Sequence, residues 1–286
     1  MFSKSAWLHL RIPFSYYLMP VYLFSLAVSD NVNTSNAIIV FIALHIFLYP
    51  ASNGFNSYFD KDEDSIGGLK NPPKVSKGLY YLALVFDLIA LLLVSFDFWV
   101  LLMFLIYGLV SKAYSHPYIR IKKYPFGSWF IAGLFQGFFT FLMVYLGLNG
   151  IRPEELLKQD ILIPALLTSL MLWGSYPMTQ IYQHDEDSRR GDNTLSLKLG
   201  ILGTFHFTMI LFSLTTVLFG LYFIEHYNLN IASLYVLAMS PVVGFFFYWY
   251  IKARKNKDVV NFEYTMRLNA ISATCLNLFF IILYLN

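Results

Sequence analysis

The chain consists largely of apolar stretches that are each long enough to cross a lipid bilayer. A hydrocarbon core of about 30 Å requires about 20 apolar residues per helix. Nine stretches meet this requirement, at about 13–29, 36–55, 79–96, 98–114, 127–148, 161–181, 201–224, 231–251 and 267–285. With 57% hydrophobic and only 13% charged residues, the chain is predicted to be an all-α membrane protein that forms a single domain over residues 1–286.

The basic residues predict how these helices are oriented. With nine spans, 18 of the 20 lysine and arginine residues fall on the side of the membrane that receives the N-terminus, and only Arg152 and Lys158 fall on the other side. Because positively charged loops remain in the cytoplasm, we expect a cytoplasmic N-terminus and a C-terminus on the opposite side. The net charge of +3 is too small to indicate nucleic acid as a partner, and the single Cys275 excludes an internal disulfide.

The end of the second predicted span carries an acidic segment, NSYFDKDED. Asn56, Asp60 and Asp64 are spaced by four residues, which places them on one stripe of an α-helix. Asp62 and Glu63 are expected to face solvent. Two carboxylates about 6 Å apart along the helix axis suit Mg²⁺, which takes one or two carboxylates and completes its shell with water and phosphate oxygens. The competing interpretation is an acidic helix end that simply meets water.

A second polar cluster, QHDEDSRRGDNT, follows the sixth predicted span. Gln183 and Asp187 are four residues apart and are predicted to share a helix face. Between the two clusters, the segment KAYSHPYIRIKK supplies Arg120, Lys122 and Lys123, which suit phosphate oxygens but are also ordinary for a cytoplasmic loop. The predicted topology places all three segments on the same side of the membrane. Acidic metal ligands beside cations are the components that a diphosphate requires.

These three segments resemble motifs of the UbiA superfamily of intramembrane prenyltransferases. NxxxDxxxD, followed by GGLKNPP, is similar to the first signature of that family, and YSHPYIRIKK is similar to its middle segment. DSRRGDNTLSLKLG is similar to the end of its second signature. The resemblance implies nine transmembrane helices around a central cavity. It also implies Mg²⁺-dependent transfer of a polyprenyl group from an isoprenoid diphosphate to a hydrophobic, aromatic or lipid-type acceptor within the bilayer, with release of diphosphate.

The resemblance also implies a role for individual residues. The implied catalytic residues are Asn56, Asp60, Asp64 and Asp187. The implied metal ligands are these four residues and Gln183. The implied substrate-binding residues are Tyr114, Arg120, Lys122, Lys123, Gln183 and Arg190. Gln183 departs from the family pattern, since it stands where the second signature, DxxxD, has its first aspartate. Its carbonyl oxygen is still a possible ligand, but the site carries one negative charge fewer.

Two alternatives remain open at this stage. A membrane terpene cyclase of the same superfamily would ionise the same diphosphate and fold the prenyl cation onto itself without an acceptor. A transporter is the more remote alternative, because transporters place their binding groups near the bilayer midplane, whereas the acidic groups of this chain lie at helix ends. A requirement for an acceptor separates the first alternative from a transferase, and release of diphosphate excludes the second.

Overall fold

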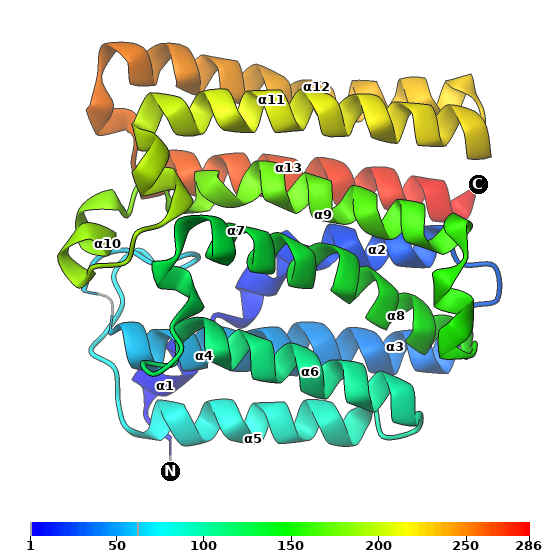
Figure 1. Cartoon of the computed structure of the whole chain (residues 1–286), viewed down its shortest axis with the longest axis horizontal. Coiled ribbons are helices and arrows are strands. Elements are labelled where there is room, and N and C mark those ends of the chain that lie inside the picture. The colour runs from blue at the N-terminus through cyan, green and yellow to red at the C-terminus, as the bar shows by residue number, and fades with distance from the viewer. Residues whose placement is uncertain (1, 62) are drawn as a thin grey trace.

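The computed structural model describes residues 2–61 and 63–286, which fold into a bundle of helices (Figure 1). In chain order the elements are α1 (Lys4–His9), η1 (Ile12–Leu18), α2 (Met19–Ala27), α3 (Thr34–Ile42), η2 (Ala43–Leu48), α4 (Tyr49–Asp60), α5 (Gly78–Leu93), α6 (Phe98–Ser115), η3 (Ile121–Lys123), α7 (Pro125–Gly133), η4 (Leu134–Phe139), α8 (Thr140–Asn149), η5 (Pro153–Leu157), α9 (Gln159–Gln180), α10 (His184–Arg190), α11 (Leu195–His226), α12 (Leu229–Lys255), η6 (Lys257–Val259) and α13 (Phe262–Leu285). No strand is present in these two ranges, which confirms the predicted all-α class. Asp62, which was expected to face solvent, lies outside the described residues.

All nine predicted spans coincide with helical segments, but not all of them are long helices. In the described part of the chain, seven helices are long and apolar enough to cross a membrane. Helix α5 is apolar but has only 16 residues. The first predicted span is divided into the 3₁₀ helix η1 and the short helix α2, each of which has a proline, Pro13 and Pro20, in its first turn. Proline lacks a backbone N–H donor and fits at the start of a helix rather than inside it.

Two of the long helices contain a π turn in the middle. The helix Thr34–Asp60 is formed by α3, the π turn η2 and α4, and the helix Pro125–Asn149 is formed by α7, the π turn η4 and α8. A π turn interrupts the regular hydrogen-bond pattern and often marks a functional position. Both turns carry a polar residue within an apolar helix, His45 on η2 and Gln136 on η4.

The second π turn packs directly against the backbone of α9. A Cβ atom at Gly137 would lie 2.6 Å from both the Cα and the N of Ser169, so only glycine permits this contact. The Ser169 hydroxyl also provides hydrogen-bond partners for the irregular backbone around the π turn. It donates to the Gly133 carbonyl oxygen at 2.9 Å and accepts from the Phe138 N–H at 2.9 Å. These contacts fix η4, and with it Gln136, against α9.

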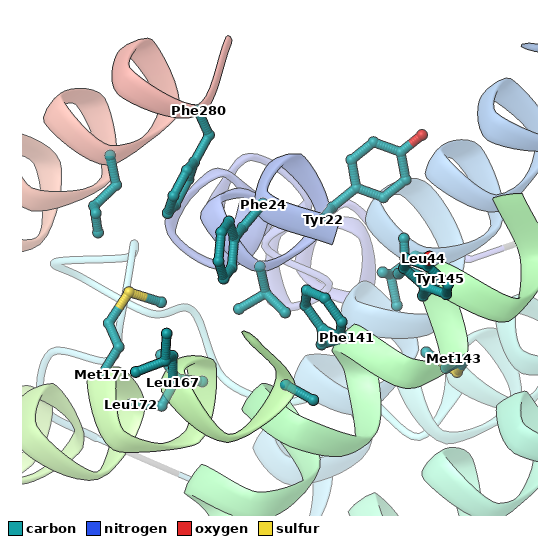
Figure 2. Close-up of a cluster of buried hydrophobic side chains, with 14 of the residues drawn as sticks. Tyr22, Phe24, Leu44, Phe141, Met143, Tyr145, Leu167, Met171, Leu172 and Phe280 are labelled. Carbon is teal, nitrogen blue, oxygen red and sulfur yellow. The ribbon is translucent and has the colours of Figure 1, made fainter. Parts of the chain in front are cut away.

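An aromatic cluster closes the core of the bundle. It consists of Phe24, Phe141, Phe219, Phe223 and Phe280, all fully buried. Figure 2 shows Phe24 of α2 between Phe280 and Phe141, with ring centroids 4.7 Å and 5.7 Å away respectively. Such ring contacts stabilise a fold by about 0.5–1.5 kcal/mol each beyond simple burial. The cluster joins α2, α8, α11 and α13, which are distant in sequence.

The polar connections gather at one end of the bundle. In Figure 1 the loop after α4, the start of α7 and the short helix α10 lie together at the left, whereas the C-terminus lies at the right. The structure therefore brings the two acidic clusters of the sequence and the basic segment between them to the same end of the molecule, as predicted.

Candidate active site

Helix α4 ends at the first of the predicted acidic ligands. Lys61 adopts the left-handed conformation, with φ 51°, so the helix stops at Asp60. The prediction that Asp64 continues the helical stripe of Asn56 and Asp60 is therefore wrong, because Asp64 lies outside α4. The Asp64 side chain is 63% exposed and accepts a hydrogen bond of 2.7 Å from Arg189.

A cavity of about 200 Å³, hereafter the polar mouth cavity, lies between the end of α4, the end of α6 and the region around α10. Its charged lining residues are three acids and three bases: Arg11, Asp60, Lys122, Asp187, Arg190 and Asp192. Uncharged lining residues that were predicted as site residues are Asn56, Tyr114 and Gln183. The structure thus brings together seven of the ten predicted site residues around one cavity. Asp64, Arg120 and Lys123 are not among the lining residues, and Lys123 is exposed, with its ammonium over the Tyr124 ring.

Asp192 organises the cations of the site and was not among the predicted site residues. Asp192 is 1% exposed and accepts hydrogen bonds from Arg120 Nε at 2.8 Å and Arg120 Nη2 at 2.9 Å. Lys122 Nζ lies 2.9 Å from Asp192 and 2.7 Å from Asp60, and Arg120 Nη1 lies 3.8 Å from Asp60. Burial alone would raise the pKa of Asp192, but the Arg120 and Lys122 contacts lower it overall. These four side chains form a buried ion network.

The ion network links three separate segments of the chain. It connects the end of α4, the turn after α6 and the turn after α10. Arg120, in the turn after α6, adopts a left-handed conformation with φ 44°. Strained backbone of this kind persists only where surrounding contacts hold it. The signal that could have revealed Asp192 is indirect: Arg120 and Lys122 have no acidic residue in their own segment, so a partner had to come from elsewhere in the chain.

Asp187 is held in a less polar setting than Asp192. It is 8% exposed, and burial raises its pKa to about 7, with nearby Lys122 acting in the opposite direction. The Thr194 hydroxyl donates to Asp187 Oδ2 at 3.3 Å. Gln183, one residue before α10, donates from its side-chain nitrogen to the Ser65 carbonyl oxygen at 3.1 Å. Gln183 thereby joins α10 to the loop after α4, and only its carbonyl oxygen suits a cation.

Several residues that line the polar mouth cavity each have a buried polar atom that the described residues leave without a hydrogen-bond partner. These atoms are Asn56 Oδ1, Ser57 Oγ, Ser115 Oγ and Gln180 Oε1. Since nearly all buried polar groups are hydrogen-bonded in native proteins, the cavity is suited to a polar ligand or an ion. Asn56, Asp60 and Asp187 supply the oxygen atoms that a hard cation prefers.

The described residues contain no group of three His, Cys, Asp or Glu side chains that is arranged to hold a metal ion. Gln183 stands where a further acidic side chain would add to Asp60 and Asp187. A cation that takes one or two carboxylates and completes its shell with phosphate oxygens does not require such a group. The residues therefore fit Mg²⁺ that binds together with a phosphate ligand.

A second cavity of about 480 Å³, hereafter the apolar chamber, lies next to the first within the helix bundle. It lies between α2, α9, α11, α12 and α13. Five residues line both cavities and form a neck between them: Phe14, Asn53, Gln136, Tyr176 and Thr179. The two cavities therefore adjoin each other at these residues, and together they suit a ligand with a polar head and an apolar body.

The aromatic cluster lies close to the apolar chamber. Pro20 of α2 and Leu276 of α13 line the chamber, and Phe24 and Phe280 lie one helical turn further along the same helices.

The double glycine after the first acidic motif shapes the neck. A Cβ atom at Gly67 would lie 2.6 Å from the ring of Phe14, and Gly68 has a φ of +81°, which L side chains rarely adopt. Arg11 Nη1 donates to the Gly67 carbonyl oxygen at 3.0 Å and holds the loop in place. The two glycines therefore allow the loop to pack on Phe14, which lines both cavities.

Comparison with known proteins agrees with this architecture. A family model described as the UbiA prenyltransferase family matches residues 17–271. No curated protein matches the chain.

Several solved structures share the fold of this chain at low sequence identity. An apo UbiA homologue from Aeropyrum pernix K1 has a TM-score of 0.72 and 17% identity, over 94% of this chain and 97% of that one. A UbiA homologue from Archaeoglobus fulgidus bound to DMAPP and Mg²⁺ has a TM-score of 0.67 and 13% identity, over 98% and 99%. A digeranylgeranylglyceryl phosphate synthase has a TM-score of 0.62 and 21% identity, over 99% of both chains.

Proposed function

Since the chain belongs to the UbiA prenyltransferase family, we propose that it transfers a prenyl group from a prenyl diphosphate to a hydrophobic acceptor and releases diphosphate. The observation that carries this proposal is the junction of a charged cavity and an apolar chamber at a neck of five shared residues. A prenyl diphosphate has the same two parts, a polyanionic head and an apolar chain. The C–O bond that breaks would then lie at the neck.

Mg²⁺ is the cofactor we propose, in line with the Archaeoglobus fulgidus homologue that is bound to DMAPP and Mg²⁺. Asn56, Asp60 and Asp187 would hold it, with the carbonyl oxygen of Gln183 as a further donor. When bound, Mg²⁺ supplies neutralisation of the negative charge on the leaving diphosphate. Asp64 belongs to the proposed ligand set as well, provided that its ion pair with Arg189 opens.

The cations of the site would hold the diphosphate. Lys122 and Arg190 line the polar mouth cavity and would contact phosphate oxygens. Arg120 would act as a positioning residue, since it contacts Asp192 and thereby fixes the place of Lys122. Tyr114 would support the neck, because its hydroxyl lies 2.6 Å from that of Tyr176.

The neck would also stabilise the prenyl cation that forms when the C–O bond breaks. The aromatic rings of Phe14 and Tyr176 line both cavities and so flank the proposed reaction point. A ring face attracts a cation by about 0.5–2 kcal/mol. The apolar chamber beyond the neck would keep water from capturing the cation.

The seven long apolar helices make the protein an integral, multi-pass membrane protein. We place the polar mouth cavity on the cytoplasmic side, because the connections at that end carry most of the lysine and arginine residues. The C-terminus would then lie on the opposite side.

A membrane terpene cyclase is the second candidate, and Gln183 is the observation that favours it. The amide removes one negative charge from the second motif, and a changed motif fits a changed use of the prenyl cation after ionisation. Such an enzyme would need no acceptor and would release a cyclic hydrocarbon or alcohol.

The test uses purified protein in lipid with Mg²⁺ and geranyl, farnesyl or geranylgeranyl diphosphate, with and without aromatic acceptors. Released diphosphate and the organic extract are both measured by mass spectrometry. A prenylated product that appears only with an acceptor supports the transferase, and a cyclic product without an acceptor supports the cyclase. Absence of Mg²⁺-dependent diphosphate release under every condition would overturn both.

Site variants connect the activity to the proposed residues. Asp60→Ala and Asp64→Ala are expected to abolish diphosphate release while the protein stays folded in detergent. Asp185→Ala is the matched control, because Asp185 is exposed and lies in the second motif. Full activity in both of the first two variants would contradict the assignment of the site.

A further inference from the structure

The connection between α12 and α13 carries a strongly basic stretch that takes no part in the proposed reaction. Residues 252–267 contain only two acids, Asp258 and Glu263, and Glu263 is paired with Lys70 of the loop after α4. In the described part of the chain, none of the bases of this stretch forms an ion pair with an acidic side chain. These bases, all of them exposed, are Lys252, Arg254, Lys255, Lys257 and Arg267.

This stretch lies where the outer face of the bundle meets the membrane surface. In Figure 1 the turn from α12 to α13, drawn in orange, lies at the same end of the bundle as α10. Tyr248 and Ile251, near the end of α12, are 48% and 54% exposed, so this part of α12 faces away from the bundle. Aromatic side chains gather at the level of the lipid headgroups, and basic residues just beyond a membrane-spanning helix meet the anionic groups of that layer.

Two tyrosines and two of the bases come together on this outer face and form what we call the tyrosine–cation cluster. The rings of Tyr248 and Tyr264 are stacked, with centroids 6.5 Å apart. Lys252 Nζ lies 4.6 Å from the centroid of the Tyr248 ring and 3.3 Å from the Tyr264 hydroxyl oxygen. The guanidinium carbon of Arg267 lies 5.9 Å from the centroid of the Tyr264 ring. The cluster thus holds two cations and a hydroxyl at one place, between α12 and α13.

A phosphate group supplies the partner that these side chains lack. Ammonium and guanidinium groups bind phosphate oxygens through charge-assisted hydrogen bonds. The Tyr264 hydroxyl accepts a hydrogen bond from Lys252 and keeps its own proton to donate. From this we propose that the tyrosine–cation cluster binds the phosphate of an anionic phospholipid headgroup, in the leaflet at the polar end of the bundle.

A lipid suits this place better than a free phosphate. The ring of Phe245 stacks on Tyr264, with centroids 6.1 Å apart, and continues the cluster along α12 toward the middle of the membrane. Phe247 and Ile251 of the same helix are exposed apolar side chains that an acyl chain can contact. A soluble phosphate would gain only the contacts with two exposed cations, which salt screens.

A bound headgroup would also brace the loop after α4. The first turns of α13 hold this loop, because Glu263 is paired with Lys70 and the sulfur atom of Met266 accepts from the Gly68 N–H at 3.4 Å. Tyr264 and Arg267 lie in the same two turns of α13. A lipid that joins these residues to Lys252 is therefore expected to raise the unfolding temperature of the protein.

The test measures lipid binding to the purified protein in detergent by native mass spectrometry. Dioleoylphosphatidylglycerol, which is anionic, and dioleoylphosphatidylcholine, which is zwitterionic, are titrated separately, and the Kd of the first bound lipid is compared. We expect phosphatidylglycerol to bind at least about tenfold more tightly, since each basic residue at an anionic headgroup contributes several-fold. Equal affinities would overturn the proposal. Displacement of phosphatidylglycerol by an equal concentration of glycerol phosphate would show that a free phosphate is the ligand, and would overturn it as well.

Two double variants make the test specific to the cluster. Lys252→Gln with Arg267→Gln is expected to weaken the binding of phosphatidylglycerol by about tenfold or more and to remove its effect on the unfolding temperature. Lys255→Gln with Lys257→Gln is the matched control, because it removes two charges from exposed positions outside the cluster; its affinity is expected to stay within about threefold of the wild type. Equal losses in the two double variants would reduce the effect to the general attraction of a basic loop and would overturn the proposal.

Tyr264→Phe provides a milder variant, because it keeps the ring and removes only the hydroxyl. We expect the affinity for phosphatidylglycerol to fall by about three- to tenfold, the size of one hydrogen bond, and the affinity for phosphatidylcholine to stay the same. An unchanged affinity for phosphatidylglycerol would overturn the assignment of this cluster. None of these measurements uses a prenyl diphosphate, so their outcome is independent of the proposed function.

Discussion

Replacing Asp192 by asparagine tests whether the buried ion network organises the polar mouth cavity. Asp192 accepts two hydrogen bonds from Arg120 and lies 2.9 Å from Lys122, at 1% exposure. Hydrogen bonds with a charged partner contribute about 1.5–3 kcal/mol each, and removing one member of a buried ion pair costs about 3–5 kcal/mol. Asparagine keeps one oxygen as an acceptor, so we expect a loss of about 3 kcal/mol in stability.

The same substitution is expected to weaken the binding of Mg²⁺. Without the charge of Asp192, Asp60 becomes the remaining acidic partner of both Arg120 and Lys122, which lie 3.8 and 2.7 Å from it. A divalent cation must then displace two cations from one carboxylate. We expect the Kd for Mg²⁺ in the presence of a prenyl diphosphate to increase at least tenfold, which corresponds to about 1.4 kcal/mol.

The assay combines thermal unfolding in detergent with calorimetric titration of Mg²⁺ in the presence of an unreactive prenyl thiodiphosphate. Asp185→Asn is the control, since it removes the same charge from an exposed position two residues before Asp187. If Asp192→Asn matches the wild type both in unfolding temperature and in Mg²⁺ affinity, the ion network does not support the site and the reasoning fails.

Three further predictions follow from the site and its supports. In the absence of divalent cations, the stability conferred by protonated Asp187 is fully present below about pH 4 and is lost as the pH rises to about 7. The reason is that its pKa in the folded state is raised to about 7 from an ordinary value of 3.8. Asp187→Asn should flatten this part of the profile of stability against pH, and an unchanged profile would contradict the raised pKa. Gly137→Ala should destabilise the protein by about 1–3 kcal/mol or prevent folding, since the new Cβ would lie 2.6 Å from the backbone of Ser169. In the same unfolding assay Gly244→Ala should be tolerated, because no atom lies within 4 Å of its Cβ position. Gln183→Asp should increase Mg²⁺ affinity in the calorimetric titration, because it adds an anionic oxygen to the polar mouth cavity; a decrease would show that the Gln183 bond to the loop after α4 matters more than the charge.

The sequence predicted the helical framework because long apolar stretches have few structural alternatives in a bilayer. The exceptions have local causes. Pro13 and Pro20 divide the first span into η1 and α2, and the helix length of α5 falls short of the usual span. The two π turns were not predicted, because they depend on contacts across the bundle, such as the one between Gly137 and Ser169, rather than on a local sequence signal.

The sequence predicted those residues of the candidate site that lie close together because of their spacing along a helix. Asn56 and Asp60 line one cavity as their four-residue spacing indicated, and Gln183 and Asp187 line the same cavity although Gln183 lies one residue before α10 rather than on it. Asp64 does not line this cavity, because the left-handed conformation of Lys61 ends α4 before Asp64 is reached. The spacing of residues along the chain carries no information about where a helix ends in this way. Asp192 is harder to place from sequence, since its partner Arg120 is 72 residues away and only the lack of an acidic residue beside Arg120 indicates that such a partner exists.

The π turn η2 has a consequence for how this chain tolerates insertions and deletions. A π hydrogen bond encloses one residue more than an α hydrogen bond, so η2 behaves as a one-residue insertion between α3 and α4. Since the wider π turn accommodates the extra residue, deleting one residue from Ala43–Leu48 would restore a continuous α-helix and leave its two halves close to their present orientation. Deleting a residue within 49–55, in the regular part of α4, would instead rotate the end of that helix by about 100° and turn Asn56 and Asp60 away from Lys122. The chain is therefore expected to tolerate the loss of a residue at η2 better than the loss of one in α4.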